Sequence, residues 1–172
     1  MKPWREGPLG RHPQLPARTI EVAAASAPAF VAILGEALGT AHFAPAEIPG
    51  GTAPGGAGEE SVVAIFRRGT AIGDLLITQV AFANRITKIG PLSMRGVIVV
   101  TTKAGAAGRT RMTVSLIEGY ELGVEFGAAV DAALERARGA NIAVDDEGWS
   151  RATDLPESSP ASPRGARAVG IR

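Results

Sequence analysis

The clearest pattern along the chain is an alternation of apolar and polar residues over two neighbouring segments. Val97–Thr102 is rich in β-branched residues, and Thr110–Ile117 carries an apolar residue at every second position. A period of two is typical of a strand with one buried face. The glycine-containing segment 103–109 between them predicts a turn. We therefore expect these segments to form an antiparallel hairpin.

A helical period follows in residues 120–138. The apolar positions with this spacing are Leu122, Phe126, Val130, Ala133 and Ala137. Acidic residues near the start and arginines near the end suit the helix dipole, and Gly139 is placed to cap the helix. Beyond it, Asn141–Val144 predicts a short final strand, and Asp145–Glu147 an acidic turn.

The N-terminal part of the domain allows two interpretations. Ser26 and Pro28 are typical of a helix start, and the apolar residues from Phe30 to Leu38 then share one helical face. Ile20–Ala25 and Ala29–Leu34 are equally compatible with short strands.

The middle of the chain predicts a loop and two strands. Residues 44–60 are rich in proline and glycine, which is typical of a loop. Val62–Phe66 and Leu75–Ala83 are apolar runs bounded by turn residues, and we expect both to be strands.

Both ends of the chain differ from this domain. Residues 1–18 and 151–172 combine proline, arginine and small residues without an apolar period, so we expect a disordered arm and a disordered tail around a single globular domain at 19–150. Trp4 and Trp149 lie near the two boundaries and could dock on the domain or stay partly exposed. Basic residues before an uncharged stretch resemble a signal peptide, but interrupting prolines favour a loose arm.

Composition excludes several classes of function. The 172 residues have a formal net charge of +1, without the basic surplus of a nucleic-acid-binding protein. No run reaches the roughly 20 apolar residues of a membrane span. The absence of cysteine excludes disulfides, thiolate zinc sites and cysteine nucleophiles. Aromatic residues make up only 5% of the chain, which predicts a thin core.

Candidate chemistry is sparse. His12 and His42 lack the helical or hairpin spacing of a histidine metal site, and neither has the context of a catalytic triad. The glycines at 50–58 and 105–108 do not continue into a phosphate-binding loop. Carboxylates that folding could bring together are Asp74, Glu118, Glu121 and Asp131. Tyr120 stands alone at a helix start. We assign no catalytic, cofactor-binding or metal-binding residue.

The charged clusters favour structural roles. Asp145–Glu147 is the tightest acidic cluster and could hold a divalent cation, but it is interpreted as a solvated turn, as is the loop pair Glu59 and Glu60. Arg67–Arg68 and Arg109–Arg111 could meet at adjacent strand ends as a small cationic patch. We interpret them instead as charges that protect strand ends from edge pairing.

One segment resembles a known family. Gly69–Val80, with Gly73-Asp74-Leu75-Leu76 before a strand, resembles a motif of β-sandwich modules in phage tail-fibre and bacterial surface proteins. A later hairpin and the stretch Ala27–Val31 fit the same pattern, so the resemblance covers about residues 27–117. It departs from the family where residues 120–138 predict a helix. Asp74 is expected to be structural, because its carboxylate can accept backbone N–H groups at a turn.

The resemblance implies a mainly β fold, an antiparallel β-sandwich with at least one packed helix. It implies a non-enzymatic module that binds a protein or glycan surface or assembles at one, on a virion or outside the cell. Two alternatives stay open. An α+β helix-grip protein would bind a small hydrophobic ligand between a long C-terminal helix and the sheet. A small oligomeric accessory protein would form homo-oligomers through its apolar helix face.

In the helix-grip alternative, side chains from the helix and from the sheet face one cavity. These are Leu122, Phe126, Val130, Met112, Val114 and Leu116.

Overall fold

The computed structural model describes residues 15–50, 60–69 and 95–171. The strands are β1 (Pro16–Ala23), β2 (Ala44–Ala46), β3 (Ser61–Arg68), β4 (Gly96–Ala104), β5 (Arg109–Glu118) and β6 (Val144–Arg151). The helices are α1 (Ala27–Thr40), α3 (Gly123–Gly139) and α4 (Pro163–Ala168). Short 3-10 turns occupy Ala24–Ser26, Tyr120–Leu122 and Ala152–Asp154.

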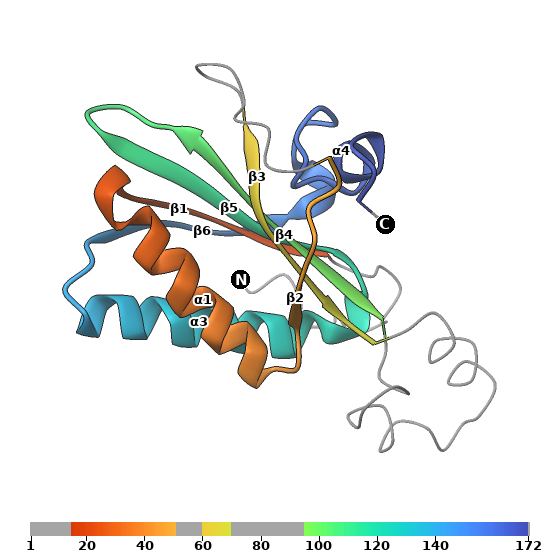
Figure 1. The fold of residues 1–172 in the computed structure, drawn as a ribbon, viewed down its shortest axis with the longest axis horizontal. Helices are drawn as coiled ribbons and strands as arrows, with labels where there is room; N and C mark the ends of the chain where they lie inside the picture. Colours follow the sequence, from red (N-terminus) through yellow and green to blue (C-terminus); the bar gives the residue numbers. More distant parts are fainter. Residues whose placement is uncertain (1–14, 51–59, 70–94, 172) are drawn as a thin grey trace.

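The described strands form one antiparallel sheet in the order β2-β3-β4-β5-β1-β6. β1 lies inside the sheet, although it comes early in the chain, and Ala17 is opposite both Ser115 of β5 and Ser150 of β6. Helices α1 and α3 pack against each other over one face of the sheet (Figure 1). Residues 152–171 lie on the opposite face, which we call the outer face.

The predicted hairpin is confirmed. Val100 lies opposite Val114, and Thr101 opposite Thr113, with one register shift near Val97. At the loop between the strands, Ala107 and Gly108 have φ of 52° and 72°. Glycine adopts this left-handed region without steric cost, which explains why Gly108 ends the turn.

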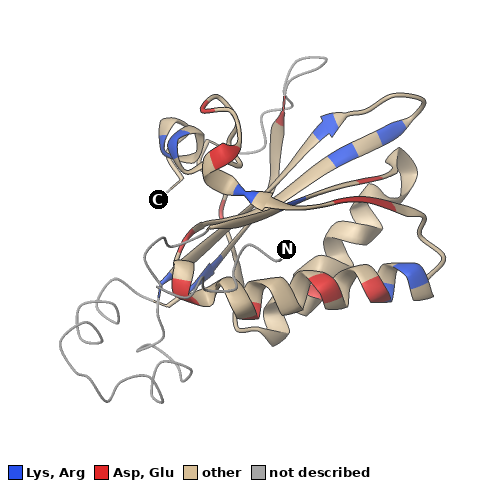
Figure 2. Cartoon of the chain, turned by 180° about the vertical axis from the view of Figure 1, so that it is seen from behind, with Lys and Arg blue, Asp and Glu red and all other residues tan. Residues whose placement is uncertain are grey.

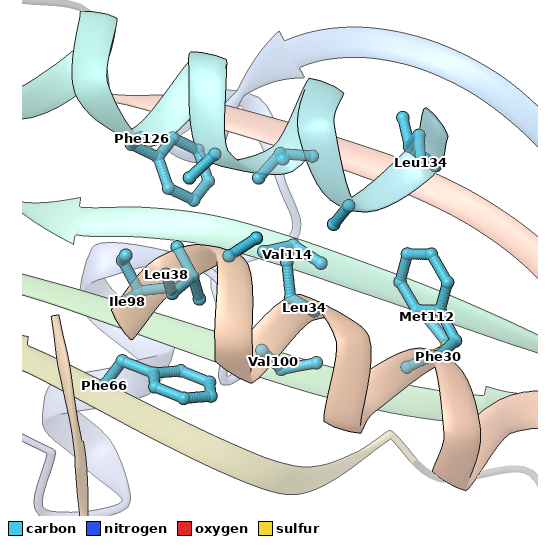
Figure 3. Packing of buried hydrophobic residues seen from close by; sticks show 14 of the residues in the cluster. Phe30, Leu34, Leu38, Phe66, Ile98, Val100, Met112, Val114, Phe126 and Leu134 are labelled. Carbon is cyan, nitrogen blue, oxygen red and sulfur yellow. The ribbon is translucent and has the colours of Figure 1, made fainter. Parts of the chain in front are cut away.

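The main core lies between the helices and the sheet. Its side chains come from α1, α3 and the inner side of β1, β3, β4 and β5. Figure 3 shows part of this packing. The largest fully buried side chains on the helices are Phe30, Leu34, Leu38, Phe126 and Leu134. The buried face of α3 also includes Gly127 and three alanines, and such small residues allow close approach between elements. The core is built from many small residues and a few phenylalanines, as the composition predicts.

The fold is mixed α+β, and this corrects the expected β-sandwich. The described residues build one sheet, and helices take the place of a second sheet. An antiparallel sheet with packed helices was expected, and both are present. Ala27–Thr40 is helical, so the strand interpretation of 29–34 is wrong. The reason is that Phe30, Leu34 and Leu38 bury one helical stripe against the sheet.

The last strand is longer and later than predicted. β6 runs from Val144 to Arg151 and contains Asp145–Glu147, which the sequence placed in a turn. β6 is an edge strand with a register shift opposite Thr19 and Ile20, and charged residues are common at such edges. Gly139 is the last residue of α3, and the left-handed residue after the helix is Asn141, with φ of 59°.

The two predicted ends also differ from expectation. β1 begins at Pro16, so the expected arm at 1–18 overlaps a strand, and residues 1–14 lie outside the described residues. A disordered tail was expected at 151–172, but residues 151–171 are ordered and bury Ala161, Ala166 and Ile171. The serines there hydrogen-bond backbone groups of a compact turn, and Pro163 begins α4. The predicted strand at 75–83 lies outside the described residues.

A charge in the core tests this packing. Val114 is 1% exposed and lies in the main core, so Val114→Asp should destabilise the domain by more than about 4 kcal/mol. Val124→Asp is the matched control, because Val124 is 58% exposed on α3. Urea unfolding followed by circular dichroism measures both. Equal stability of the two variants would contradict the structure.

Candidate functional site

The outer face of the sheet has an apolar end. Ile65, Val97, Val99 and Ile117 form what we call the apolar patch, and each is at most 9% exposed. They alternate with residues that enter the main core, because successive strand residues point to opposite faces. The patch is covered by residues 152–171, which we call the C-terminal segment.

The C-terminal segment contacts the patch through Ala166 and Ile171, and Ile171 is only 1% exposed. One side-chain hydrogen bond joins it to the sheet: the Ser115 hydroxyl donates to the carbonyl oxygen of Ala161 at 2.7 Å. The backbone N–H of Ala152 donates to the carbonyl of Leu15 at 2.7 Å, where the segment leaves β6. The attachment is therefore chiefly apolar.

The C-terminal segment also holds its own shape. Ser162 caps α4: its hydroxyl oxygen accepts the N–H of Gly165 at 3.0 Å and its O–H donates to the carbonyl of Ser159 at 2.9 Å. The Ser159 hydroxyl accepts the N–H of Ala161 at 3.1 Å. A side chain at Gly165 would collide with the backbone of Ser159, so this position requires glycine. Arg164 pairs with Glu157 inside the segment.

The middle of the outer face is a row of three threonines. Thr101, Thr113 and Thr19 lie opposite one another on β4, β5 and β1, and all are buried. The hydroxyl of Thr101 donates to the carboxylate of Glu60. This row separates the apolar patch from the charged end of the face.

The charged end consists of residues we call the charged band: Lys103, Arg109, Arg111, Glu21, Asp145 and Glu147. Arg109 Nη2 lies 2.6 Å from Asp145 Oδ2, and its Nε lies 3.4 Å from Glu21 Oε2. Arg111 pairs with Glu147 at 2.5 Å. The cations lie on β4 and β5, and the anions lie on the neighbouring strands β1 and β6 (Figure 2).

The charged band was missed as a site because its parts were interpreted separately. Arg109 and Arg111 are two residues apart on β5, and so are Asp145 and Glu147 on β6. In a strand this spacing places side chains on one face. The two-residue spacing in the sequence therefore indicates that each pair shares a face. Only the strand order shows that the arginine pair and the acidic pair lie close together.

A second charged group lies on the helix side of the sheet, around Arg18. Its Nη1 donates to Asp131 of α3 at 2.8 Å, and its Nε donates to Asp146 of β6 at 2.8 Å. The guanidinium lies 4.7 Å from the centre of the Trp149 ring. The Arg18 side chain is 11% exposed. This group ties β1, β6 and α3 together, and it shows that Trp149 is part of the domain.

The ionisation of the group follows from these contacts. The hydrogen bond from Arg18 holds the pKa of Asp146 below its ordinary value, although burial acts in the opposite direction. Burial would lower the pKa of Arg18, but hydrogen bonds and charge from Asp146 and Asp131 outweigh it and raise that pKa. The contacts therefore favour the charged forms of the Arg18 guanidinium and the Asp146 carboxylate.

Arg68 is a buried arginine on β3. It is 4% exposed, its Nη1 donates to the carbonyl of Ala41 at 3.2 Å, and its guanidinium lies 5.8 Å from the centre of the Phe43 ring. Ala41 is the C-cap of α1, whose last turn has no basic residue of its own. A cation at the negative end of a helix dipole is stabilising, so Arg68 has a structural role.

Arg67–Arg68 and Arg109–Arg111 do not form a common cationic patch, which was the less favoured of the two interpretations. Arg68 lies opposite Gly96 at the start of β4, whereas Arg111 lies opposite Lys103 near its end. β3 and β5 run in the same direction, because each is antiparallel to β4, so the end of β3 and the start of β5 are far apart along the strands. Only Arg109 and Arg111 belong to the charged band.

The carboxylates that folding could have brought together have different partners. Glu118 pairs with Arg95 at 3.4 Å and Asp131 pairs with Arg18, while Glu121 accepts a hydrogen bond from Tyr120 and raises its pKa. Among the described residues, no three His, Asp or Glu side chains are placed to hold a metal ion. His42 is exposed at the end of α1. His12, Glu59 and Asp74 lie outside the described residues.

The Arg18 group predicts a dependence of stability on pH. Because the pKa of Asp146 is depressed in the folded state, the ion pair contributes stability above about pH 4 and loses it as the pH falls through the folded-state pKa. Asp146→Asn should destabilise the domain by about 1–3 kcal/mol at pH 6. Urea unfolding should give a smaller difference from the wild type at pH 3. Asp145→Asn is the exposed control, and an unchanged difference for Asp146→Asn would count against the ion pair.

Comparison of the chain with protein-family models, curated proteins and solved structures finds no match. The resemblance to phage tail-fibre and bacterial surface modules therefore stays a prediction. Most of the motif that carries it, Gly69–Val80, lies outside the described residues. In the described part of the chain, no helix has the length and apolar character needed to cross a membrane.

Proposed function

We propose that the chain is a non-enzymatic binding module whose outer sheet face binds a polypeptide partner. One observation carries the proposal: a polypeptide, the chain's own C-terminal segment, lies on the apolar patch of that face. The segment is held by side-chain packing and not as an added strand. The same surface chemistry would suit a partner protein with a small apolar anchor.

The attachment of the segment supports exchange of one polypeptide for another. Its internal hydrogen bonds and the Arg164–Glu157 pair stay within the segment when it leaves the sheet. Its departure would expose four aliphatic side chains on one continuous patch, the kind of surface that marks protein-interaction sites. A partner that covers the patch would recover the free energy lost when the segment leaves.

The helix-grip alternative receives less support. An antiparallel sheet packed against a long helix agrees with the fold, but the long helix α3 is followed by β6 and α4 and is not C-terminal. However, the side chains assigned to its cavity belong to one packed core cluster, and each is at most 3% exposed. They are Leu122, Phe126, Val130, Met112, Val114 and Leu116. Side chains that already bury one another favour recognition at the surface over recognition inside the domain.

The place where the module would act is inferred from its resemblance to phage tail-fibre and bacterial surface modules. We propose a protein or glycan surface, on a virion or outside the cell, as the place where the module acts. The polypeptide-covered patch favours a protein as the partner. The described carboxylates support a non-enzymatic role, because Glu118 and Asp131 are engaged with separate arginines.

A labelled peptide with the sequence of residues 156–171 tests the proposal. Ile171→Asp places a charge at a site that is 1% exposed and should loosen the chain's own segment. The peptide should then bind this full-length variant at least about tenfold more tightly than it binds the wild type, in fluorescence anisotropy titrations. In the wild type the segment in cis competes for the patch.

Val169→Asp is the matched control, because Val169 is 47% exposed in the same segment. It should bind the peptide as weakly as the wild type does. Circular dichroism checks that all three proteins are folded. If the folded Ile171→Asp variant does not bind the peptide above the wild-type level, the outer face is not a polypeptide-binding surface.

A further inference from the structure

We propose that the charged band is a self-association surface, which fits a second copy of this chain across a two-fold axis. The band lies at the opposite end of the outer face from the C-terminal segment (Figures 1 and 2). The inference goes beyond the proposed function, because it does not require the C-terminal segment to leave the sheet.

The order of charges across the strands is the first step. Lys103 lies opposite Arg111, Arg111 lies opposite Glu21, and Glu21 lies opposite Asp145. One row across β4, β5, β1 and β6 therefore reads two cations followed by two anions. The charge of the row changes from positive to negative between β5 and β1. Arg109 lies on β5, which carries a cation of the row, and Glu147 lies on β6, which carries an anion.

Two-fold symmetry makes this row complementary to itself. In a closed dimer the same surface of both copies forms the contact. When two such faces meet across an axis along the boundary between β5 and β1, β5 of one copy faces β1 of the other. Lys103 then faces Asp145 of the second copy, and Arg111 faces its Glu21. Every cation of the row meets an anion, and no charge meets its own copy.

The energetics allow the exchange of partners. The Arg111–Glu147 pair is solvent-exposed, at 49% and 41%, and Asp145 is 76% exposed, whereas Arg109 and Glu21 are half-buried at 29% each. Exposed ion pairs contribute little stability. Lys103 has no ion pair among the described residues and is exposed. The formal net charge of +1 gives little long-range repulsion between copies. Charge complementarity mainly gives orientation and speed of association, so we expect a weak, salt-sensitive dimer.

A nucleic acid fits this surface less well than a second copy does. The anions on β1 and β6 would repel phosphates that approach the cations on β4 and β5. An acidic or basic protein would match only one half of the band. A second copy is the partner that satisfies both halves at once.

Charge reversal with a mixing experiment tests the proposal. Lys103→Glu and Asp145→Lys each change one exposed residue of the row. Sedimentation velocity should show association of the wild type at low salt and its loss at high salt. Each variant alone should remain monomeric, because like charges would face each other twice. An equal mixture of the two should associate again, because the heterodimer restores every opposite-charge contact.

The control pair lies on the helix side of the molecule. Arg136→Glu and Glu36→Lys break an exposed ion pair between α3 and α1, with 3.6 Å between Arg136 Nη1 and Glu36 Oε2 in the wild type. Each control variant should associate at low salt as the wild type does. A wild type that stays monomeric at low salt, or a mixture of the band variants that stays monomeric, would overturn the proposal. Peptide binding to Ile171→Asp is read separately, so failure of one proposal does not imply failure of the other.

Discussion

The arrangement of the chain depends on β1 forming hydrogen bonds along both of its edges. Ala17, Thr19 and Glu21 each lie opposite residues of β5 on one side and β6 on the other. Without β1, the β2–β5 meander and the final strand would be unconnected in the sheet. Arg18 reinforces the join from the helix side, because one guanidinium binds carboxylates on α3 and on β6.

The same strand organises both faces of the sheet. Ile20 and Val22 enter the main core under the helices, whereas Thr19 and Glu21 continue the threonine row and the charged band. The outer face thus passes from apolar to hydroxyl to charged along the strands. An apolar end retains its own polypeptide cover, and a charged end stays open to solvent. The two proposed contacts would therefore use different ends of one face.

Local sequence patterns were sufficient to predict the hairpin and α3, because both elements depend on residues that are close in sequence. The alternation in Thr110–Ile117 and the helical spacing from Leu122 to Ala137 report one buried face directly. The strand order was beyond such patterns, since the position of β1 depends on partners almost 100 residues away. For the same reason the charged band could not be predicted. The composition of the C-terminal segment is typical of disorder and predicts a disordered tail. In the structure, Ser159 and Ser162 instead hydrogen-bond backbone groups in a compact turn, and composition does not reveal these bonds.

The position of β1 has a consequence for how the chain folds during synthesis. Ala17 leaves the ribosome well before Ser115 and Ser150, the residues it pairs with. Closing such long loops costs entropy before any contact offsets it, and proteins with a high contact order fold slowly. A nascent β1 therefore exposes two unpaired edges while the rest of the sheet is made. In the cell this interval is when the chain is most open to chaperones and to mispairing with its neighbours.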